Sequence, residues 1–135
     1  GDYKFINDMA AFVEQNKPVK EGTKEIQVNK FVVFDAKVMT LPEKQSTDYL
    51  NTAMSVAKVD PFPVVEHAMF VGVSDKVVIP VYVEKSVVAE IQRLYQRYGG
   101  EGFRADKLRF AGIHVYNYSK GPAIVVESIA EAKGK

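Results

Sequence analysis

The chain has 135 residues, of which 47% are hydrophobic and 26% are charged, a composition typical of a globular domain that buries its own core. Its 18 basic and 17 acidic residues leave a formal net charge of +1. The chain as a whole therefore has no long-range attraction for nucleic acid or an anionic membrane. Cysteine is absent, which excludes disulfides, thiolate metal sites and cysteine nucleophiles. The apolar runs are far shorter than the roughly 20 residues of a membrane-spanning helix.

The N-terminal segment has the pattern of an amphipathic helix. Apolar side chains recur at helical spacing over residues 3–15, and Pro18 ends this pattern. We interpret residues 1–24 as an N-terminal helix with its linker. Because the chain begins with Gly1 and not with Met, we expect a processed or trimmed N-terminus. This expectation favours a periplasmic or secreted location over a cytoplasmic one.

A long strand and an inserted helix are predicted next. Residues 25–39 combine a run that is apolar on both faces with an alternating stretch, as in the curved first strand of a small barrel. Residues 45–59 place apolar side chains at helical spacing, and we expect them to form a helix after this strand.

A hairpin followed by a single helix is predicted in the middle of the chain. Residues 64–84 contain two β-rich runs with a turn between them. Pro80 lies in the second run and lacks a backbone N–H, so we expect an edge position or a bulge there. Residues 86–98 carry apolar side chains along one helical face, and the pair Gly99-Gly100 is predicted to end this helix.

Two further β-rich runs, residues 108–118 and 122–129, complete the pattern, and residues 131–135 form a polar tail. In the first of these runs, the apolar side chains change parity at Gly112. Such a change is expected for a bulge that lets a barrel strand turn a corner.

The order of these elements resembles the OB-fold, a small Greek-key barrel with its helix between strands three and four. The resemblance is topological, covers about residues 25–130, and is to small bacterial OB-like proteins of unknown function that have an N-terminal helix. It implies an α+β fold that is mainly β, with a five-stranded barrel at residues 25–130. A helix-first sheet of the cystatin type is the competing fold, and the helix at residues 86–98 argues against it.

The resemblance also indicates where a ligand would bind. His114, Tyr116 and Tyr118 alternate along one predicted strand and lead into the loop between strands four and five, part of the usual OB binding surface. Aromatic rings there can stack on bases or sugar rings, and the same rings can instead simply cover the barrel. The ligand-binding candidates are Phe70, Tyr82, His114, Tyr116, Tyr118 and Lys120. We expect a non-enzymatic barrel that binds an oligonucleotide or an oligosaccharide.

The arginines form a second candidate site. All four of them lie between residues 93 and 109, and the planar guanidinium fork suits phosphate or carboxylate. The anion-binding candidates are Arg93, Arg97, Arg104 and Arg109. The alternative interpretation is that Arg93 and Arg97 simply form the solvated face of a helix.

No residue pattern predicts catalysis, a metal site or a cofactor. His67 and His114 are the only histidines, and their positions lack a paired ligand spacing. Asp35 is a charge inside an apolar run, and we expect it to pair with Lys37 on the same strand face. The alternative function is a protein–protein interaction module of the bacterial cell envelope. Such a module would use a sheet edge or the connector at residues 60–63, and it could form a homo-oligomer.

Overall fold

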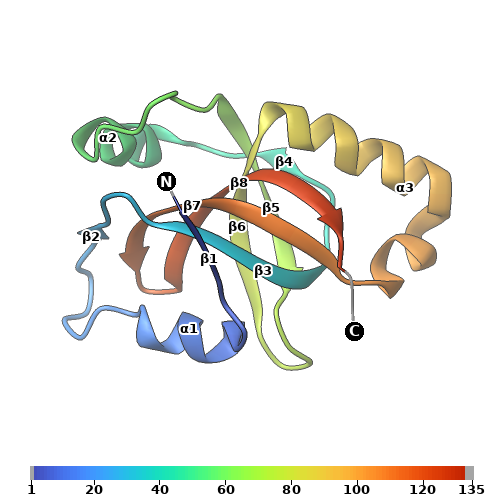
Figure 1. Ribbon diagram of the computed structural model, residues 1–135, viewed down its shortest axis with the longest axis horizontal. Helices are drawn as coiled ribbons and strands as arrows, with labels where there is room; N and C mark the ends of the chain where they lie inside the picture. The colour runs from blue at the N-terminus through green and yellow to red at the C-terminus, as the bar shows by residue number, and fades with distance from the viewer. Residues whose placement is uncertain (1, 133–135) are drawn as a thin grey trace.

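The computed structural model describes residues 2–132 and has a mixed α+β fold, in which helices surround a single sheet (Figure 1). The elements in chain order are β1 (Tyr3–Phe5), α1 (Met9–Gln15), β2 (Glu25–Ile26), β3 (Phe31–Val38), β4 (Glu43–Lys44), α2 (Asp48–Val56), β5 (Val65–Gly72), β6 (Val78–Glu84), α3 (Lys85–Ala105), β7 (Leu108–Tyr118) and β8 (Gly121–Glu131). No helix within the described residues is long and apolar enough to cross a membrane. Of the predicted polar tail, residues 133–135 lie outside the described part of the chain.

The longer strands pair in a ring. Strand β3 pairs with β5, β5 with β6, β6 with β8, β8 with β7, and β7 again with β3. All these pairs are antiparallel except β6–β8, a parallel ladder that joins only Tyr82 to Val125 and Val83 to Val126. We call this short ladder the seam. The β7–β8 ladder, in contrast, runs from Leu108 to Tyr118, so the seam is the shorter of the two joins that β8 makes.

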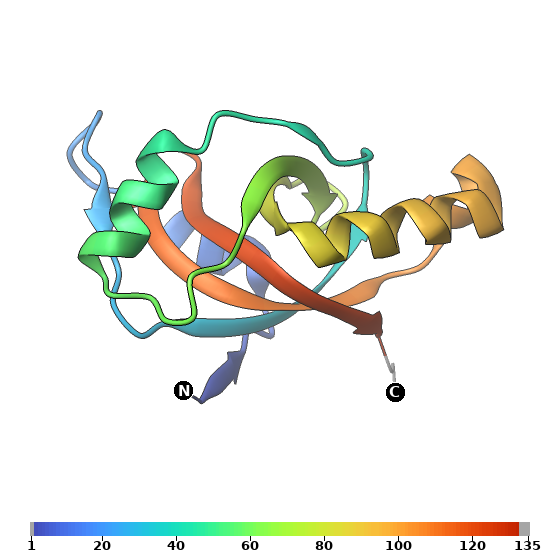
Figure 2. The same ribbon diagram turned by 90° about the horizontal axis from the view of Figure 1, so that it is seen from above.

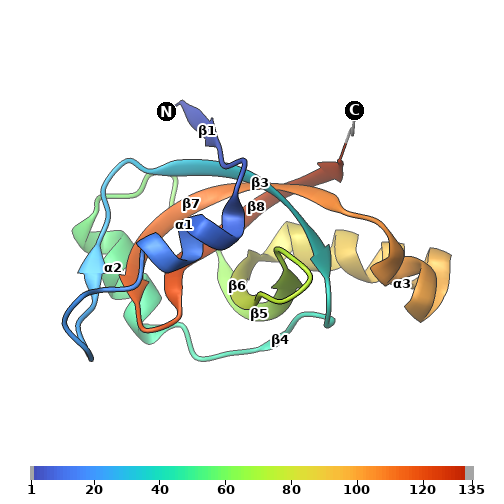
Figure 3. The ribbon, with the colours of Figure 1, turned by 90° about the horizontal axis from the view of Figure 1, so that it is seen from below.

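Two groups of buried side chains form the core. The larger one includes Phe34 and Phe110, whose rings stack with centroids 5.5 Å apart, and it is covered by side chains of α1 and α3. Figure 3 shows α1 lying across the curved strands. The smaller group lies under α2, where Leu50 and Met54 are fully buried. Figure 2 shows α2 and α3 at opposite ends of the molecule, so each end of the ring has its own apolar cover.

The prediction of one helix over residues 3–15 is wrong in its first part. Residues Tyr3–Phe5 form the edge strand β1, which pairs in parallel with the start of β3. Only Met9–Gln15 is helical. The helix begins after Asp8, whose carboxylate accepts a hydrogen bond of 3.0 Å from the backbone N–H of Ala11 and so caps the first turn. This polar cap divides the apolar pattern between a strand and a helix.

Helix α3 has a kink at the predicted stop, and a second helical stretch follows the kink. It includes residues 86–98 as predicted, but it continues to Ala105. Gly99 adopts φ = 73° inside it, a left-handed conformation that glycine reaches without steric cost. The resulting kink lets Phe103 pack against Tyr95, with ring centroids 5.4 Å apart. The regular helix is therefore interrupted at Gly99, as the sequence predicts, and what the sequence does not predict is the second helical stretch up to Ala105.

The other predicted elements are present, except that the single strand predicted over residues 25–39 is divided into the short strand β2 and the longer strand β3. The hairpin predicted over residues 64–84 is the β5–β6 pair, and the inserted helix predicted over residues 45–59 is α2. The predicted bulge at Gly112 is present, because the β7–β8 pairing shifts between Ala111 and Gly112. A Cβ atom at Gly112 would lie 2.0 Å from the carbonyl oxygen of Val125. The two backbones can approach this closely only because residue 112 has no side chain.

Candidate functional site

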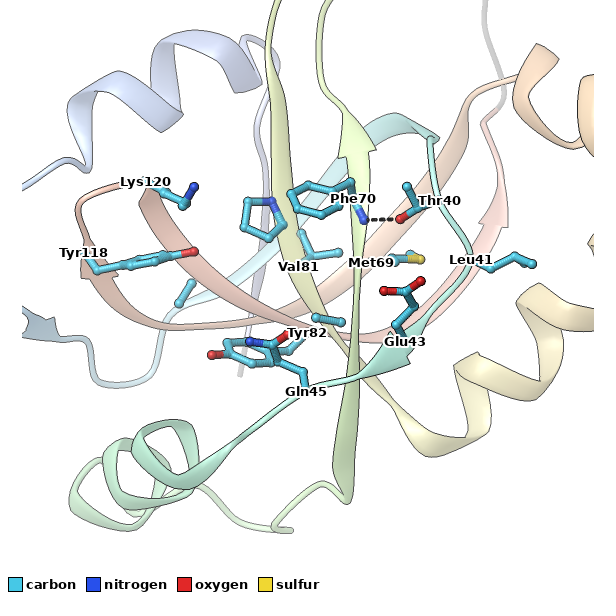
Figure 4. A pocket seen from close by; sticks show the side chains of 13 residues that line it. Thr40, Leu41, Glu43, Gln45, Met69, Phe70, Val81, Tyr82, Tyr118 and Lys120 are labelled. Carbon is cyan, nitrogen blue, oxygen red and sulfur yellow. Dashed lines mark hydrogen bonds between the residues drawn. The ribbon is translucent and has the colours of Figure 1, made fainter.

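A cavity of about 290 Å³ opens on the outer face of the β5–β6 hairpin (Figure 4). The hairpin contributes Phe70 and Pro80, which are paired across the two strands, and Tyr82. The connection that leaves β3 closes one side, and the β7–β8 turn closes another with Tyr118 and Lys120. Three segments that are far apart in the sequence therefore meet at one site.

The connection from Met39 to Gln45, which we call the strap, is tied to the edge of β5. The hydroxyl of Thr40 accepts a hydrogen bond of 2.9 Å from the backbone N–H of Phe70 (Figure 4). Within the strap, Glu43 pairs with Ala68 in the short β4–β5 ladder. These bonds hold the polar side chains of the strap at the rim of the cavity.

Four of the six ligand-binding candidates line this cavity, namely Phe70, Tyr82, Tyr118 and Lys120. Phe70 is 45% exposed, so its ring is available to a ligand. The other two candidates, His114 and Tyr116, are only 4% and 3% exposed. They lie in the interior, where a ligand in this cavity would not reach them.

A bulge in β7 separates His114 from the tyrosines. The β7–β8 pairing shifts between His114 and Tyr116, which breaks the predicted alternation along one face. The His114 ring then packs against Phe12 of α1, with ring centroids 5.4 Å apart. Its Nε2 atom lies 2.6 Å from Oδ1 of Asn117. Burial lowers the pKa of His114, so the buried ring is neutral at physiological pH.

Tyr116 supports the cavity from behind. Its ring packs edge-on against Tyr49 of α2 at 4.8 Å and against Tyr118 at 5.6 Å. Its hydroxyl lies 3.1 Å from that of Tyr82. Burial raises the pKa of Tyr116, and it raises the pKa of Tyr118 to about 12. Both hydroxyls are therefore protonated at neutral pH, and Tyr116 fixes the two tyrosines that face the cavity.

The positive and negative side chains that line the cavity offset each other. Glu43 and Lys120 are its charged residues at neutral pH. The remaining polar groups are uncharged, such as the amide of Gln45, and Phe70 with Pro80 provides an apolar surface. The cavity thus combines aromatic rings with hydrogen-bonding groups and has no excess of positive charge.

Pro80 lies where β6 separates from β8. It pairs with Phe70 on the β5 side, whereas the β6–β8 ladder of the described residues begins only at Tyr82. The predicted edge position of Pro80 is therefore confirmed. Because proline has no backbone N–H, this part of the edge offers one donor fewer to a pairing strand.

The predicted pair of Asp35 and Lys37 is wrong. Asp35 instead binds Arg109 on the neighbouring strand through two hydrogen bonds of 2.8 and 3.0 Å. The same guanidinium lies over the ring of Phe5, 4.8 Å from its centroid. The two strands place Asp35 directly opposite Arg109, and this cross-strand register is not visible in the sequence.

The other arginines make separate contacts. Arg104 donates a hydrogen bond of 3.2 Å from Nε to the carbonyl oxygen of Met39 and so anchors the start of the strap. Arg97 lies over the ring of Tyr98, 5.5 Å from its centroid, and Arg93 is exposed on α3. None of the arginines lines the hairpin cavity.

Sequence reasoning missed the strap residues Thr40, Glu43 and Gln45 as parts of the site. The signal that could have found them is the break at Leu41-Pro42, which ends the first long strand. Such a break predicts a connecting loop, and connecting loops often contain binding residues.

The geometry contains no group that would mark the site as a metal centre. Within the described residues, no three His, Asp or Glu side chains are grouped closely enough to hold an ion.

Comparison with protein-family models and with curated protein sequences finds no match to this chain. The functional conclusion therefore depends on the site itself.

Proposed function

We propose that the protein is a binding barrel of the OB type that takes an oligosaccharide into the hairpin cavity. The strand pairings support the barrel. If β3, β5, β6, β7 and β8 are counted as strands one to five, the ring runs in the order 1-2-3-5-4. Helix α3 then follows the third strand and precedes the fourth. Such a Greek-key order is that of the OB architecture.

The position of the cavity is the observation that carries the proposal. OB barrels bind oligonucleotides and oligosaccharides on the face of strands two and three, between the loops 1–2 and 4–5. The cavity lies on the corresponding hairpin, β5–β6, between the strap and the β7–β8 turn. The aromatic rings of Phe70, Tyr82 and Tyr118 come from the strands and the turn that surround it.

The charge balance of the cavity favours a sugar over a nucleic acid. A groove for single-stranded nucleic acid needs positive charge along the backbone path, and here Lys120 is offset by Glu43. A sugar ring offers an apolar C–H face to an aromatic ring and hydroxyls to polar groups, the combination that this cavity provides. The side chains of Glu43 and Gln45 are the polar partners for those hydroxyls.

An extended protein strand is the competing occupant, as in an interaction module of the cell envelope. Such a strand would pair with the free edge of β6. Pro80 lies on that edge and supplies no N–H, which weakens a continuous ladder. Pro80 instead presents an apolar ring surface beside Phe70, a surface that suits a sugar better than a peptide backbone.

The proposal is tested by screening neutral oligosaccharides on a glycan array and measuring the best one by isothermal titration calorimetry. We expect affinity that is insensitive to salt, because no ion pair contributes to binding. Replacement of the exposed ring in Phe70→Ala should weaken binding at least about tenfold, a loss of about 1.4 kcal/mol.

Tyr98→Ala is the matched control, because Tyr98 is an exposed ring on α3 and away from the cavity. This variant should bind like the unchanged protein. An oligothymidine titration provides the contrasting case. Tight binding of oligothymidine that falls steeply with salt, without binding of any glycan, would replace the oligosaccharide proposal by a nucleic-acid one.

A further inference from the structure

A second cavity, of about 320 Å³, lies on another part of the surface and shares no lining residue with the hairpin cavity. It is formed by β1, the segment before β3, the connection after α2, and β8. Tyr3 and Phe31 form an aromatic wall with ring centroids 5.5 Å apart. Ile113 is buried at its base, and Lys58 and Asp60 are exposed at its rim.

Glu127 on β8 contributes a half-buried carboxylate to this cavity. Its Oε1 atom accepts a hydrogen bond of 3.5 Å from the hydroxyl of Tyr3. No lysine or arginine in residues 2–132 lies within ion-pairing distance of it. Burial raises the pKa of Glu127, the hydrogen bond from Tyr3 opposes this rise, and the nearby carboxylate of Glu84 adds to it. The cavity thus holds a negative charge that its surroundings do not neutralise.

We propose that this second cavity binds an alkylammonium group, with Glu127 as its counter-ion and the Tyr3–Phe31 wall beside it. A primary ammonium carries one positive charge and three N–H donors, which matches a carboxylate that lacks a cationic partner. A cation is also attracted to the faces of aromatic rings. The alkyl stem packs on the apolar base at Ile113. This inference does not rest on the proposed sugar site.

The simpler alternative is that Lys58 of this chain, and not a ligand, neutralises Glu127. Its side chain is exposed at the rim, and it would compete with the ligand if it folded over Glu127. Lys58→Met removes that competitor and keeps a long apolar stem. We expect this variant to bind an alkylammonium ion as tightly as the unchanged protein, or more tightly. Loss of binding in this variant would contradict the inference.

The test titrates the full chain with butylammonium, and ¹H–¹⁵N NMR spectra monitor the binding. We expect saturable shifts around Glu127 and Phe31 at millimolar probe, a weak affinity typical of one charged contact. Glu127→Gln should weaken binding at least about tenfold. Glu131→Gln is the matched control, because Glu131 is exposed on the same strand, and it should have no effect.

Loss of binding in Glu127→Gln will not reflect unfolding. A neutral amide in place of a destabilised carboxylate is expected to stabilise the folded chain at neutral pH, which a urea unfolding curve checks. Uncharged 1-butanol reports the apolar contribution alone. Equal shifts with 1-butanol and butylammonium, or unchanged binding in Glu127→Gln, would overturn the inference.

The ammonium group could come from a free amine or from a lysine side chain of another protein. Lysine amide acetylated at its α-amino group keeps the charged side-chain ammonium on a similar alkyl stem. This compound, N-acetyl-lysine amide, therefore represents the second source. Tighter binding of N-acetyl-lysine amide than of butylammonium assigns the cavity to a protein lysine. The reverse order assigns it to a small amine. If neither binds at millimolar concentration, the inference is wrong.

Discussion

His114 illustrates how a residue that looks functional in the sequence can serve the fold. It lies between Phe12 of α1 and Asn117 of its own strand, and Asn117 in turn donates a hydrogen bond to Glu25 of β2. The imidazole thus links three elements from the inside. Protonation of this imidazole therefore affects the stability of the protein, and the ring does not contact the hairpin cavity.

This position predicts a pH dependence of stability. Burial lowers the pKa of His114 in the folded chain below the value of about 6.5 in the unfolded chain. The unfolded chain therefore binds the proton more tightly, and the free energy of unfolding should fall as pH drops below about 6.5. Urea unfolding between about pH 8 and pH 5 measures this fall.

A variant pair assigns the effect to this histidine. His114→Gln keeps a polar side chain but cannot titrate, so its stability profile should flatten over this range. His67→Gln should keep the fall, because His114 is still present. A profile that is the same in His114→Gln and the unchanged protein would contradict the assignment to His114.

Residue patterns predicted the aromatic part of the site better than its polar part. Phe70, Tyr82 and Tyr118 were identifiable because they lie on the predicted hairpin and beside the predicted last turn, where the resemblance places a binding surface. Tyr116 has the same sequence pattern as Tyr118, but it is buried beside Tyr49 of α2. Only the placement of α2 over the sheet decides which tyrosine lines the cavity, and no local sequence pattern indicates that placement.

At the scale of elements, glycine has two different roles in this chain. Gly112 allows two backbones to meet in the ring, because a Cβ atom there would collide with the carbonyl of Val125. Gly100 lies in the second half of α3, where a Cβ atom would meet only ordinary contacts of 3.5 Å or more. The two positions therefore form a matched pair for substitution.

We expect Gly112→Ala to destabilise the protein by about 3 kcal/mol, since the backbone of β7 or β8 must shift to admit a methyl group. Gly100→Ala should be neutral or stabilising by up to about 1 kcal/mol, because alanine is the better helix former. Chemical denaturation of both variants measures the difference. Similar stabilities of the two variants would mean that the bulge tolerates a side chain.

The elements themselves were largely predictable because their apolar periodicities are strong. The hairpin, the inserted helix and the last two strands follow from spacing alone. Strand β1 and the second half of α3 were missed for one shared reason. Each depends on a tertiary contact: Tyr3–Phe5 pairs with β3, and Phe103 is buried in the larger core group. Such contacts override the local sequence signals.

At the scale of the whole molecule, the ring is unevenly joined. The seam contains two residue pairs, whereas the β7–β8 ladder extends over most of both strands. Local opening occurs where few hydrogen bonds hold a structure. We expect backbone amides bonded across the seam to exchange with solvent faster than those in the centre of the β7–β8 ladder. Native-state hydrogen exchange by NMR measures both, and equal protection would show that the ring opens only as a unit.

The seam also sets how the ring of strands would respond to a ligand bound in the hairpin cavity. Tyr82 belongs to both, since it pairs with Val125 in the seam and lines the cavity beside Tyr118. Any molecule that holds Tyr82 against Tyr118 therefore also restrains a join of the ring that has only two residue pairs. Binding would then slow the local opening of the β6–β8 pair and so slow hydrogen exchange across the seam, with no change in the average structure.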